Sequence, residues 1–297
     1  MTQGVQKAAE ISTQAAAESA PSAPAAGSAQ AMGEQISRSI IHHITNSNEI
    51  EIPFIGAVHL PEIHLFGLDL SITKHVVMMW LAGLILLVLF GVAFRRRDLV
   101  PRGLANLLEA GVQFVRDEIA IRNLGEKDGR RLAPYLLTVF FFILTCNLMG
   151  LVPYAATPTG NINVTGTLAL GTLLLIQIEG IRRHGIFKHF KHMVPSGLPV
   201  WMFPVSIMIF VIELLGFVVI KPFALMVRLF ANMTAGHVAI LAFISIIFAL
   251  QKVWAAGISV PFALFVCLLE ILVALIQAYV FTMLSSLFIG LSLHPSH

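Results

Sequence analysis

The chain alternates long apolar blocks with short polar segments, and the blocks have the length of membrane-spanning helices. Residues 76–94 carry no charge and end abruptly at Arg95, the first of three consecutive arginines. A helix needs ~20 apolar residues to cross the hydrocarbon core of a bilayer. Blocks of similar length cover 133–153 and 163–180, and the link 154–162 between them is free of charge. We therefore predict three spans in the first two thirds of the chain.

The last third contains two longer apolar blocks, 201–250 and 258–293. Fifty residues of α-helix reach ~75 Å, whereas the hydrocarbon core is ~30 Å thick. The first block is therefore either two spans joined tightly or one strongly tilted, bent helix. We favour the bent helix, because the block has no polar link and its one break is Lys221–Pro222, where proline would kink a helix.

Residues 101–119 repeat apolar side chains at helical spacing with charged residues between them, which predicts an amphipathic helix on the membrane surface. The whole pattern predicts an all-α integral membrane protein. It has five membrane-crossing helices and one surface helix, and the last two spans are long, tilted and paired as a hairpin.

The segment before the first span differs in composition. Residues 1–35 are rich in Ala, Ser, Gln and Pro, and they lack both the apolar core of a signal peptide and the arginines of a transit peptide. We interpret them as a flexible tail. Residues 36–75 are then an ordered lead-in outside the membrane, and 76–297 form the membrane channel domain.

Composition supports the membrane assignment, since 57% of residues are hydrophobic and 12% are charged, against ~25% charged in soluble domains. The net charge of +3 gives no reason to expect nucleic-acid binding. Cys146 and Cys267 lie inside apolar runs and are interpreted as buried or lipid-facing thiols. No P-loop pattern is present, and we expect no catalytic residue, cofactor or metal.

Basic residues set the expected orientation. Segment 95–131 holds nine Lys and Arg, the loop 182–192 holds four, and the link 154–162 holds none. The positive-inside rule places both basic segments in the cytoplasm and the link outside. The N-terminus is then outside and the C-terminus cytoplasmic. The missing transit signal favours a bacterial inner membrane.

Two ionisable residues lie deep inside the last two blocks. Residues 200–297 carry five formal charges, and of these Arg228 and Glu270 are far from either end of their blocks; the others are Glu213, Lys221 and Lys252. Such residues are costly in a membrane and usually face a partner or a water-filled path. Arg228 therefore indicates a functional site more strongly than a structural ion pair.

A hairpin of the last two blocks brings polar residues together. Facing residues of antiparallel helices have position numbers with a constant sum, which is 507 for His237 and Glu270 and 505 for Arg228 and Gln277. Both pairs therefore fit one hairpin that turns near residue 253. Asn232, four residues after Arg228, shares its face, whereas His237 lies about half a turn away.

These residue types suit proton transfer. Arginine keeps its charge, so Arg228 can attract a carboxylate and repel a hydronium ion without relaying protons. Histidine and a buried carboxyl can both take up and release protons. Alternatively, His237 and Glu270 form a purely structural hydrogen-bonded pair, and Gln277 only satisfies contacts between helices.

At this point the sequence resembles a known family. VRLFANMTAGH (227–237), followed by EILVALIQAYVF (270–281), resembles the paired motifs of the a subunit of F-type ATP synthases, the stator channel subunit of Fo. The resemblance covers 76–293 in the number and order of spans, and includes the surface helix and NLMGLVP (147–153).

The resemblance implies a mechanism. The last two helices would lie tilted against a rotating ring of c subunits, each with one carboxylate at mid-membrane. Arg228 matches the essential arginine that separates two half-channels, and a proton would pass His237 and Glu270 to reach the ring. Proton flow would then be coupled to rotation and ATP synthesis.

Other positions and partners follow from the same resemblance. Asn232 and Gln277 would shape the polar path. Glu213 lies near an acidic position of the family, although its spacing to Lys221 is one residue longer than expected. The implied partners are the c-subunit ring, b-type peripheral stalk subunits, other ATP synthase subunits and the lipid bilayer, and the chain itself would not be an enzyme.

Two alternative functions fit the sequence less well. A self-contained proton-coupled secondary transporter would use the same Arg, Glu and His, but such transporters often contain internal repeats. No repeat relates 76–180 to 200–293. A structural anchor would not need Arg228 in mid-helix.

Overall fold

The computed structural model describes residues 49–52, 56–59, 64–65, 68–69, 71, 73–95, 103–152, 157–185, 203–250 and 253–294. The chain divides into residues 1–42 and 43–297, and the described residues all belong to the second unit. The predicted tail 1–35, most of the basic loop 182–192 and the turn residue Lys252 lie outside the described residues.

The lead-in forms two short antiparallel hairpins that the sequence analysis did not predict. Strand β1 (Glu49–Ile52) pairs with β2 (Gly56–His59), and β3 (His64–Leu65) pairs with β4 (Leu68–Asp69). Strand β1 reads Glu-Ile-Glu-Ile, the two-residue alternation typical of a strand. The lead-in is therefore ordered at these strands.

Within the described residues, five helices are long and apolar enough to cross a membrane, which confirms the predicted all-α membrane fold. The first three are α3 (Lys74–Ala93), α6 (Glu126–Met149) and α7 (Ile162–His184). The fourth candidate span lies within Val218–Phe243, and the fifth lies within α11 (Val253–Leu293). Helix α6 begins before the predicted apolar start at residue 133, because its charged first turns are also helical.

The predicted surface helix consists of α4 (Leu104–Phe114), the π-helix η1 (Val115–Ile121) and the short helix α5 (Arg122–Leu124). Its inner face is buried at Leu108, Val115 and Ile119, whereas Leu104, Leu107 and Phe114 are exposed. One face therefore packs on the protein, while apolar side chains remain free to meet lipid.

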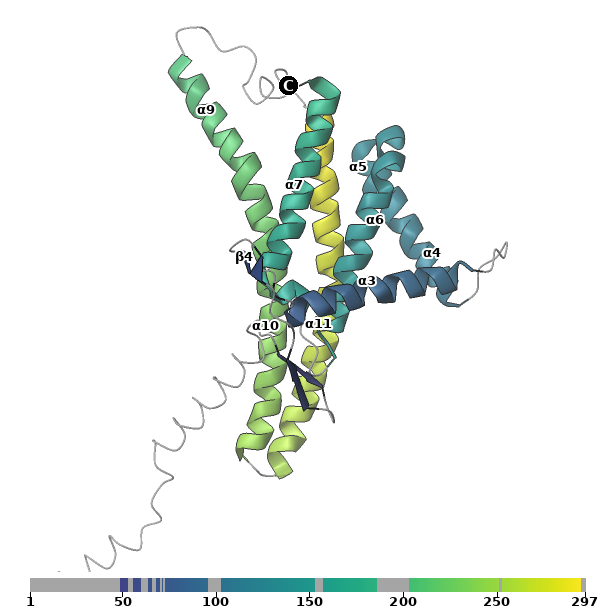
Figure 1. The fold of residues 1–297 in the computed structure, drawn as a ribbon, viewed down its shortest axis with the longest axis vertical. Helices are drawn as coiled ribbons and strands as arrows, with labels where there is room; N and C mark the ends of the chain where they lie inside the picture. The colour runs from purple at the N-terminus through teal and green to yellow at the C-terminus, as the bar shows by residue number, and fades with distance from the viewer. Residues whose placement is uncertain are drawn as a thin grey trace, which may run out of the picture. The chain divides into compact units, whose positions relative to one another are not determined.

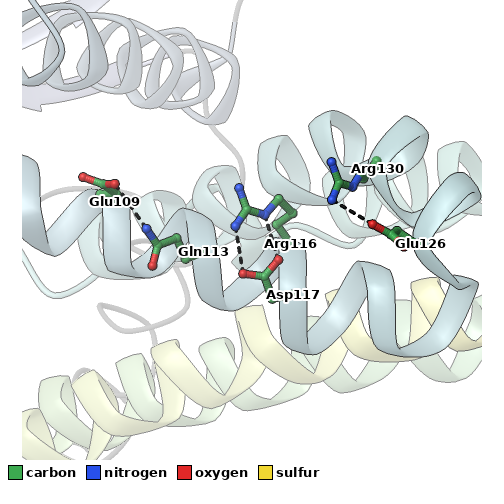
Figure 2. A network of polar contacts seen from close by, with 6 residues as sticks. All are labelled: Glu109, Gln113, Arg116, Asp117, Glu126 and Arg130. Atoms are coloured by element: carbon green, nitrogen blue, oxygen red, sulfur yellow. Dashed lines mark hydrogen bonds and ion pairs between the residues drawn. The ribbon is translucent and has the colours of Figure 1, made fainter. Parts of the chain in front are cut away.

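Polar side chains on this segment pair with one another, and a further pair lies within the start of α6 (Figure 2). Gln113 donates to Glu109, Arg116 makes two hydrogen bonds of 2.8 Å to Asp117, and Arg130 donates to Glu126. The hydrogen bond from Arg116 holds the pKa of Asp117 below its ordinary value. Exposed pairs of this kind contribute little stability, so they mark a hydrated face.

The 201–250 block is one continuous helical run in the described residues. Helix α9 (Phe203–Leu215) passes through the π-helix η4 (Gly216–Ile220) into α10 (Lys221–Leu250). The Lys221 N–H bonds to the Gly216 carbonyl, five residues back. Because Pro222 has no N–H and its ring would strike the carbonyl four residues earlier, the wider turn occurs where a break was predicted.

The core lies where α6, α7, α10 and α11 meet, and it includes Leu136, Ile143, Ile176, Leu229 and Phe281. Helices α6, α7 and α11 run side by side (Figure 1).

Polar contacts hold these helices together at one end. Arg131 of α6 bonds to buried Glu179 of α7, and Ser292 of α11 donates to the Ile176 carbonyl at 3.1 Å. Both contacts cross between helices, one to a carboxylate and one to a backbone carbonyl. This end of the bundle is therefore held by direct bonds as well as by packing.

Candidate functional site

Helices α10 and α11 run side by side in opposite directions (Figure 1), in the predicted register. The rings of Phe243 and Phe262 stack with centroids 5.9 Å apart. The Lys221 Nζ atom lies 5.1 Å from the centroid of the Phe288 ring. The position sums of these pairs, 505 and 509, agree with those predicted for the polar pairs.

Glu270 lies against α10 beside His237. A methyl group added at Gly236 would lie 2.7 Å from Glu270 Oε1, so the carboxyl packs directly on the backbone next to His237. Glu270 is only 3% exposed, and within the described residues neither carboxyl oxygen has a hydrogen-bond partner. Within the described residues, Glu270 therefore accepts no hydrogen bond from His237. The role of the two residues stays a prediction.

Arg228 points away from the core. The inner face of α10 is buried at Leu225, Leu229 and Met233, whereas Arg228 and Asn232 are exposed. Within the described residues Arg228 makes no hydrogen bond or ion pair, and so none to Gln277, which is buried on α11. The predicted pairing of Arg228 with Gln277 therefore stays a prediction.

Apolar side chains of both channel helices are exposed as well. Phe223 on α10 is 57% exposed, and Leu272 and Leu275 on α11 are 52% and 51% exposed. The site thus has two parts. Arg228 and Asn232 face outward, while Glu270 and Gln277 face inward and His237 is partly buried.

Buried polar residues that the sequence analysis did not select lie close to Glu270. Asn147, fully buried at the end of α6, accepts a hydrogen bond of 2.6 Å from Thr159. It also donates to the carbonyl of Ala274, 3.4 Å away and one turn beyond Glu270 on α11. Thr159 belongs to the 3-10 helix η2 (Pro158–Gly160), which precedes α7. Asn147 therefore links α6 and η2 to the backbone of the channel hairpin.

Two threonines extend this group. The hydroxyls of Thr157 and Thr234 are buried without a hydrogen-bond partner in the described part of the chain. A methyl group added at Gly160 would lie 3.7 Å from Thr157 Cβ and 3.9 Å from Thr234 Oγ1, so both threonines lie beside η2. We call Asn147, Thr157, Thr159, Thr234 and Glu270 the polar cluster. Buried unpaired polar groups require water or a proton to satisfy them.

The remaining predicted positions lie on the other side of Arg228. Lys221 is partly buried at the start of α10, and Glu213 is in α9. The side chain of Glu213 lies outside the described residues.

The chain matches a family of known membrane proteins. The ATP synthase A chain family matches residues 76–290, which include all five candidate spans up to that point and both motifs. The chain belongs to this family. It is 48% identical over 264 residues to ATP synthase subunit a of Chloroherpeton thalassium, covering 86% of this chain and 77% of the relative.

Other relatives give the same result. ATP synthase subunit a of Anaeromyxobacter sp. strain Fw109-5 is 45% identical over 90% of this chain and 73% of its own length. ATP synthase subunit a 2 of Chlorobium luteolum is 49% identical over 85% of this chain and 74% of its own length. As a family member, the chain is a multi-pass membrane protein and a proton-translocating stator subunit of Fo, and it works with other ATP synthase subunits.

Proposed function

We propose that the chain provides two half-channels that protonate and deprotonate the carboxylates of a c-subunit ring, and so couples proton flow to rotation. Arg228 carries this proposal. The Arg228 side chain is exposed in the candidate span Val218–Phe243 and has no partner within the described residues. A permanent cation that faces lipid is strongly unfavourable. We therefore expect an anionic group of another subunit to pair with the Arg228 guanidinium.

The buried part of the site would form the access path from outside. The polar cluster lies where α6 ends and α7 begins, the end that the charge-free link 154–162 joins. A proton would pass through this cluster to Glu270 and His237, and then to a ring carboxylate. Arg228 and Asn232 would form the barrier beyond which the carboxylate releases its proton to the cytoplasm.

The setting follows from the same proposal. The protein is non-catalytic, since nucleotide chemistry would belong to other subunits. Its further partners are b-type peripheral stalk subunits. It lies in a bacterial inner membrane with the N-terminus outside and the C-terminus in the cytoplasm, because the basic segments then face the cytoplasm.

Membrane vesicles that contain the complete complex test this function. We expect Arg228→Ala to abolish ATP-driven proton pumping, and Arg122→Ala on the surface segment to serve as the matched control with normal pumping. His237→Ala should slow pumping less severely, because water or Glu270 can replace a proton relay but not a fixed charge. Normal coupled pumping by Arg228→Ala would refute the half-channel proposal.

A further inference from the structure

A buried serine near the C-terminal end of α11 is bonded to two other elements. Ser286 donates a hydrogen bond of 3.0 Å to the Ile119 carbonyl of η1, and it accepts one of 2.6 Å from the side chain of Asn123 in α5. A serine hydroxyl has one proton to donate, and here that proton goes to η1. One side chain of α11 therefore holds both η1 and α5.

One turn further along α11, a glycine lets two backbones touch. A methyl group added at Gly290 would lie 2.8 Å from the backbone oxygen of Asn123 and 3.6 Å from Leu124 Cδ2. Side-chain carbons essentially never come within 3.0 Å of other atoms. The same segment packs equally closely on α6, where a methyl group added at Gly129 would lie 2.7 Å from Ile121 Cα. Glycines thus allow η1 and α5 to contact the backbones of both α6 and α11.

Two further hydrogen bonds join the end of α11 to α7. Ser292 donates to the Ile176 carbonyl at 3.1 Å, and the Leu293 carbonyl accepts a hydrogen bond of 3.0 Å from His184 Nε2. The end of α11 is therefore held by η1, α5 and α7. We call the four residues of α11 that make these contacts the α11 anchor: Ser286, Gly290, Ser292 and Leu293.

The α11 anchor belongs to the helix that carries the buried part of the candidate site. Ser286 lies ~14 Å beyond Gln277 and ~24 Å beyond Glu270 along the axis, at ~1.5 Å per residue. Helix α11 is continuous over this stretch, so a displacement at the anchor also displaces both side chains. Groups that exchange a proton must come within hydrogen-bond reach, and a misplacement of ~1 Å can slow a reaction about 100-fold.

We propose that the α11 anchor holds Glu270 and Gln277 at a fixed distance from the ring carboxylates, and that it stays closed while the ring turns. This inference rests on the proposed function, in which a moving ring lies against α10 and α11. A ring carboxylate that pairs with Arg228 pulls on this hairpin as it moves, and bonds from α11 to three elements of its own chain oppose the pull. Ser286 and Gly290 are positioning residues, because neither touches a reacting group.

Gly290→Ala tests the position of α11 in vesicles that contain the complete complex. The methyl group must separate α11 from the Asn123 oxygen by about 0.6 Å, the difference between 3.4 and 2.8 Å, since a backbone oxygen cannot rotate away. We expect about ten-fold slower ATP-driven proton pumping per assembled complex. Gly171→Ala on α7 is the matched control, because no described atom lies within 4 Å of its methyl group. Unchanged pumping by Gly290→Ala would overturn the proposal.

Ser286→Ala removes both bonds of the hydroxyl and should slow pumping per assembled complex about three- to ten-fold. Ser286→Cys keeps a weak donor and acceptor of similar size and should recover part of the loss. Thr167→Ala is the control, because it removes an exposed hydroxyl that bonds within its own helix. Fewer assembled complexes with normal pumping per complex would show a structural role alone and would count against the positioning role.

A cross-link tests whether the α11 anchor stays closed. Asn123→Cys combined with Ser286→Cys places two thiols where side-chain atoms now lie 2.6 Å apart, and the cross-linked fraction is measured by mass spectrometry. We expect oxidation to preserve or raise pumping, because the disulfide replaces the lost hydrogen bonds. Pumping that stops on oxidation and returns on reduction would show that the anchor opens during the cycle, which contradicts the proposal. If no disulfide forms, Gly290→Ala decides.

Arg228→Ala in the same vesicles distinguishes this inference from the proposed function. If Arg228→Ala stops pumping while Gly290→Ala and Ser286→Ala pump normally, only the role of the α11 anchor is refuted. If Arg228→Ala pumps normally, the half-channel proposal is refuted, and the inference about the anchor fails with it.

Discussion

Replacing Gly236 by Ala perturbs a close contact between the two channel helices. The added methyl group would lie 2.7 Å from Oε1, 2.9 Å from Cδ and 3.2 Å from Cγ of Glu270. Ordinary contact begins at 3.4 Å, so the carboxyl must move by about 0.7 Å, the difference between 3.4 and 2.7 Å, or the helices must separate. Because Cγ is also too close, rotating the carboxyl alone does not relieve the overlap.

The expected effect is a loss of proton conduction with the complex still assembled. Overpacking of this kind disfavours the native arrangement by about 1–3 kcal/mol, and the higher helix propensity of Ala returns about 1 kcal/mol. A net penalty of about 1.4 kcal/mol on placing the Glu270 carboxyl corresponds to a ten-fold slower transfer. We therefore predict about ten-fold slower passive proton conduction through vesicles that contain Fo alone.

Two further variants make this result specific. Gly171→Ala on α7 is the matched control, since nothing lies within 4 Å of a methyl group there, and it should conduct normally. Glu270→Asp combined with Gly236→Ala shortens the side chain by one methylene and should recover part of the loss. Conduction by Gly236→Ala equal to that of the unchanged protein would show that Glu270 does not need its present position.

Two more predictions concern buried polar contacts. Asn147→Leu removes the hydrogen bonds to Thr159 and to the Ala274 carbonyl and should destabilise the subunit by about 1–3 kcal/mol. The purified complex should then show lower thermal stability, and proton conduction should be slower. Unchanged thermal stability and conduction would show that Asn147 does not have this role. Glu179→Gln removes the carboxylate that Arg131 binds most closely and leaves only Asp128, 3.8 Å away. It should destabilise the subunit by about 1–2 kcal/mol, a range reduced because Arg131 is half exposed. Glu179→Gln with Arg131→Gln should recover part of that loss, and a greater loss in the double variant would contradict the pairing.

Much of the fold could be predicted, because the length of apolar blocks determines which segments span a membrane. The hairpin register was also accessible, since His237 and Glu270 fit only one turn position, and the contact of Gly236 with Glu270 agrees with it. The Lys221–Pro222 break was predicted as a kink. The π-turn itself was not predicted, because the sequence alone does not show how the backbone hydrogen bonds of the helix rearrange around the missing N–H of Pro222.

The polar cluster was harder to predict. Asn147 was visible as a polar residue in an apolar run, but its partners belong to η2 and to the backbone of α11, far away in sequence. No periodic pattern relates these segments. The outward direction of Arg228 likewise depends on which face of α10 the core buries, and this became clear only from Leu225, Leu229 and Met233.

The most direct test of the account is the distance between the Arg228 guanidinium and a carboxylate of the c-subunit ring in the intact complex. We predict that one ring carboxylate lies within about 4 Å of Arg228, or one water layer beyond that, since the two charges would pair directly or through water. The polar cluster should then open toward a different ring subunit. An Arg228 side chain that faces lipid, or one that binds a carboxylate of its own chain, would contradict the central claim.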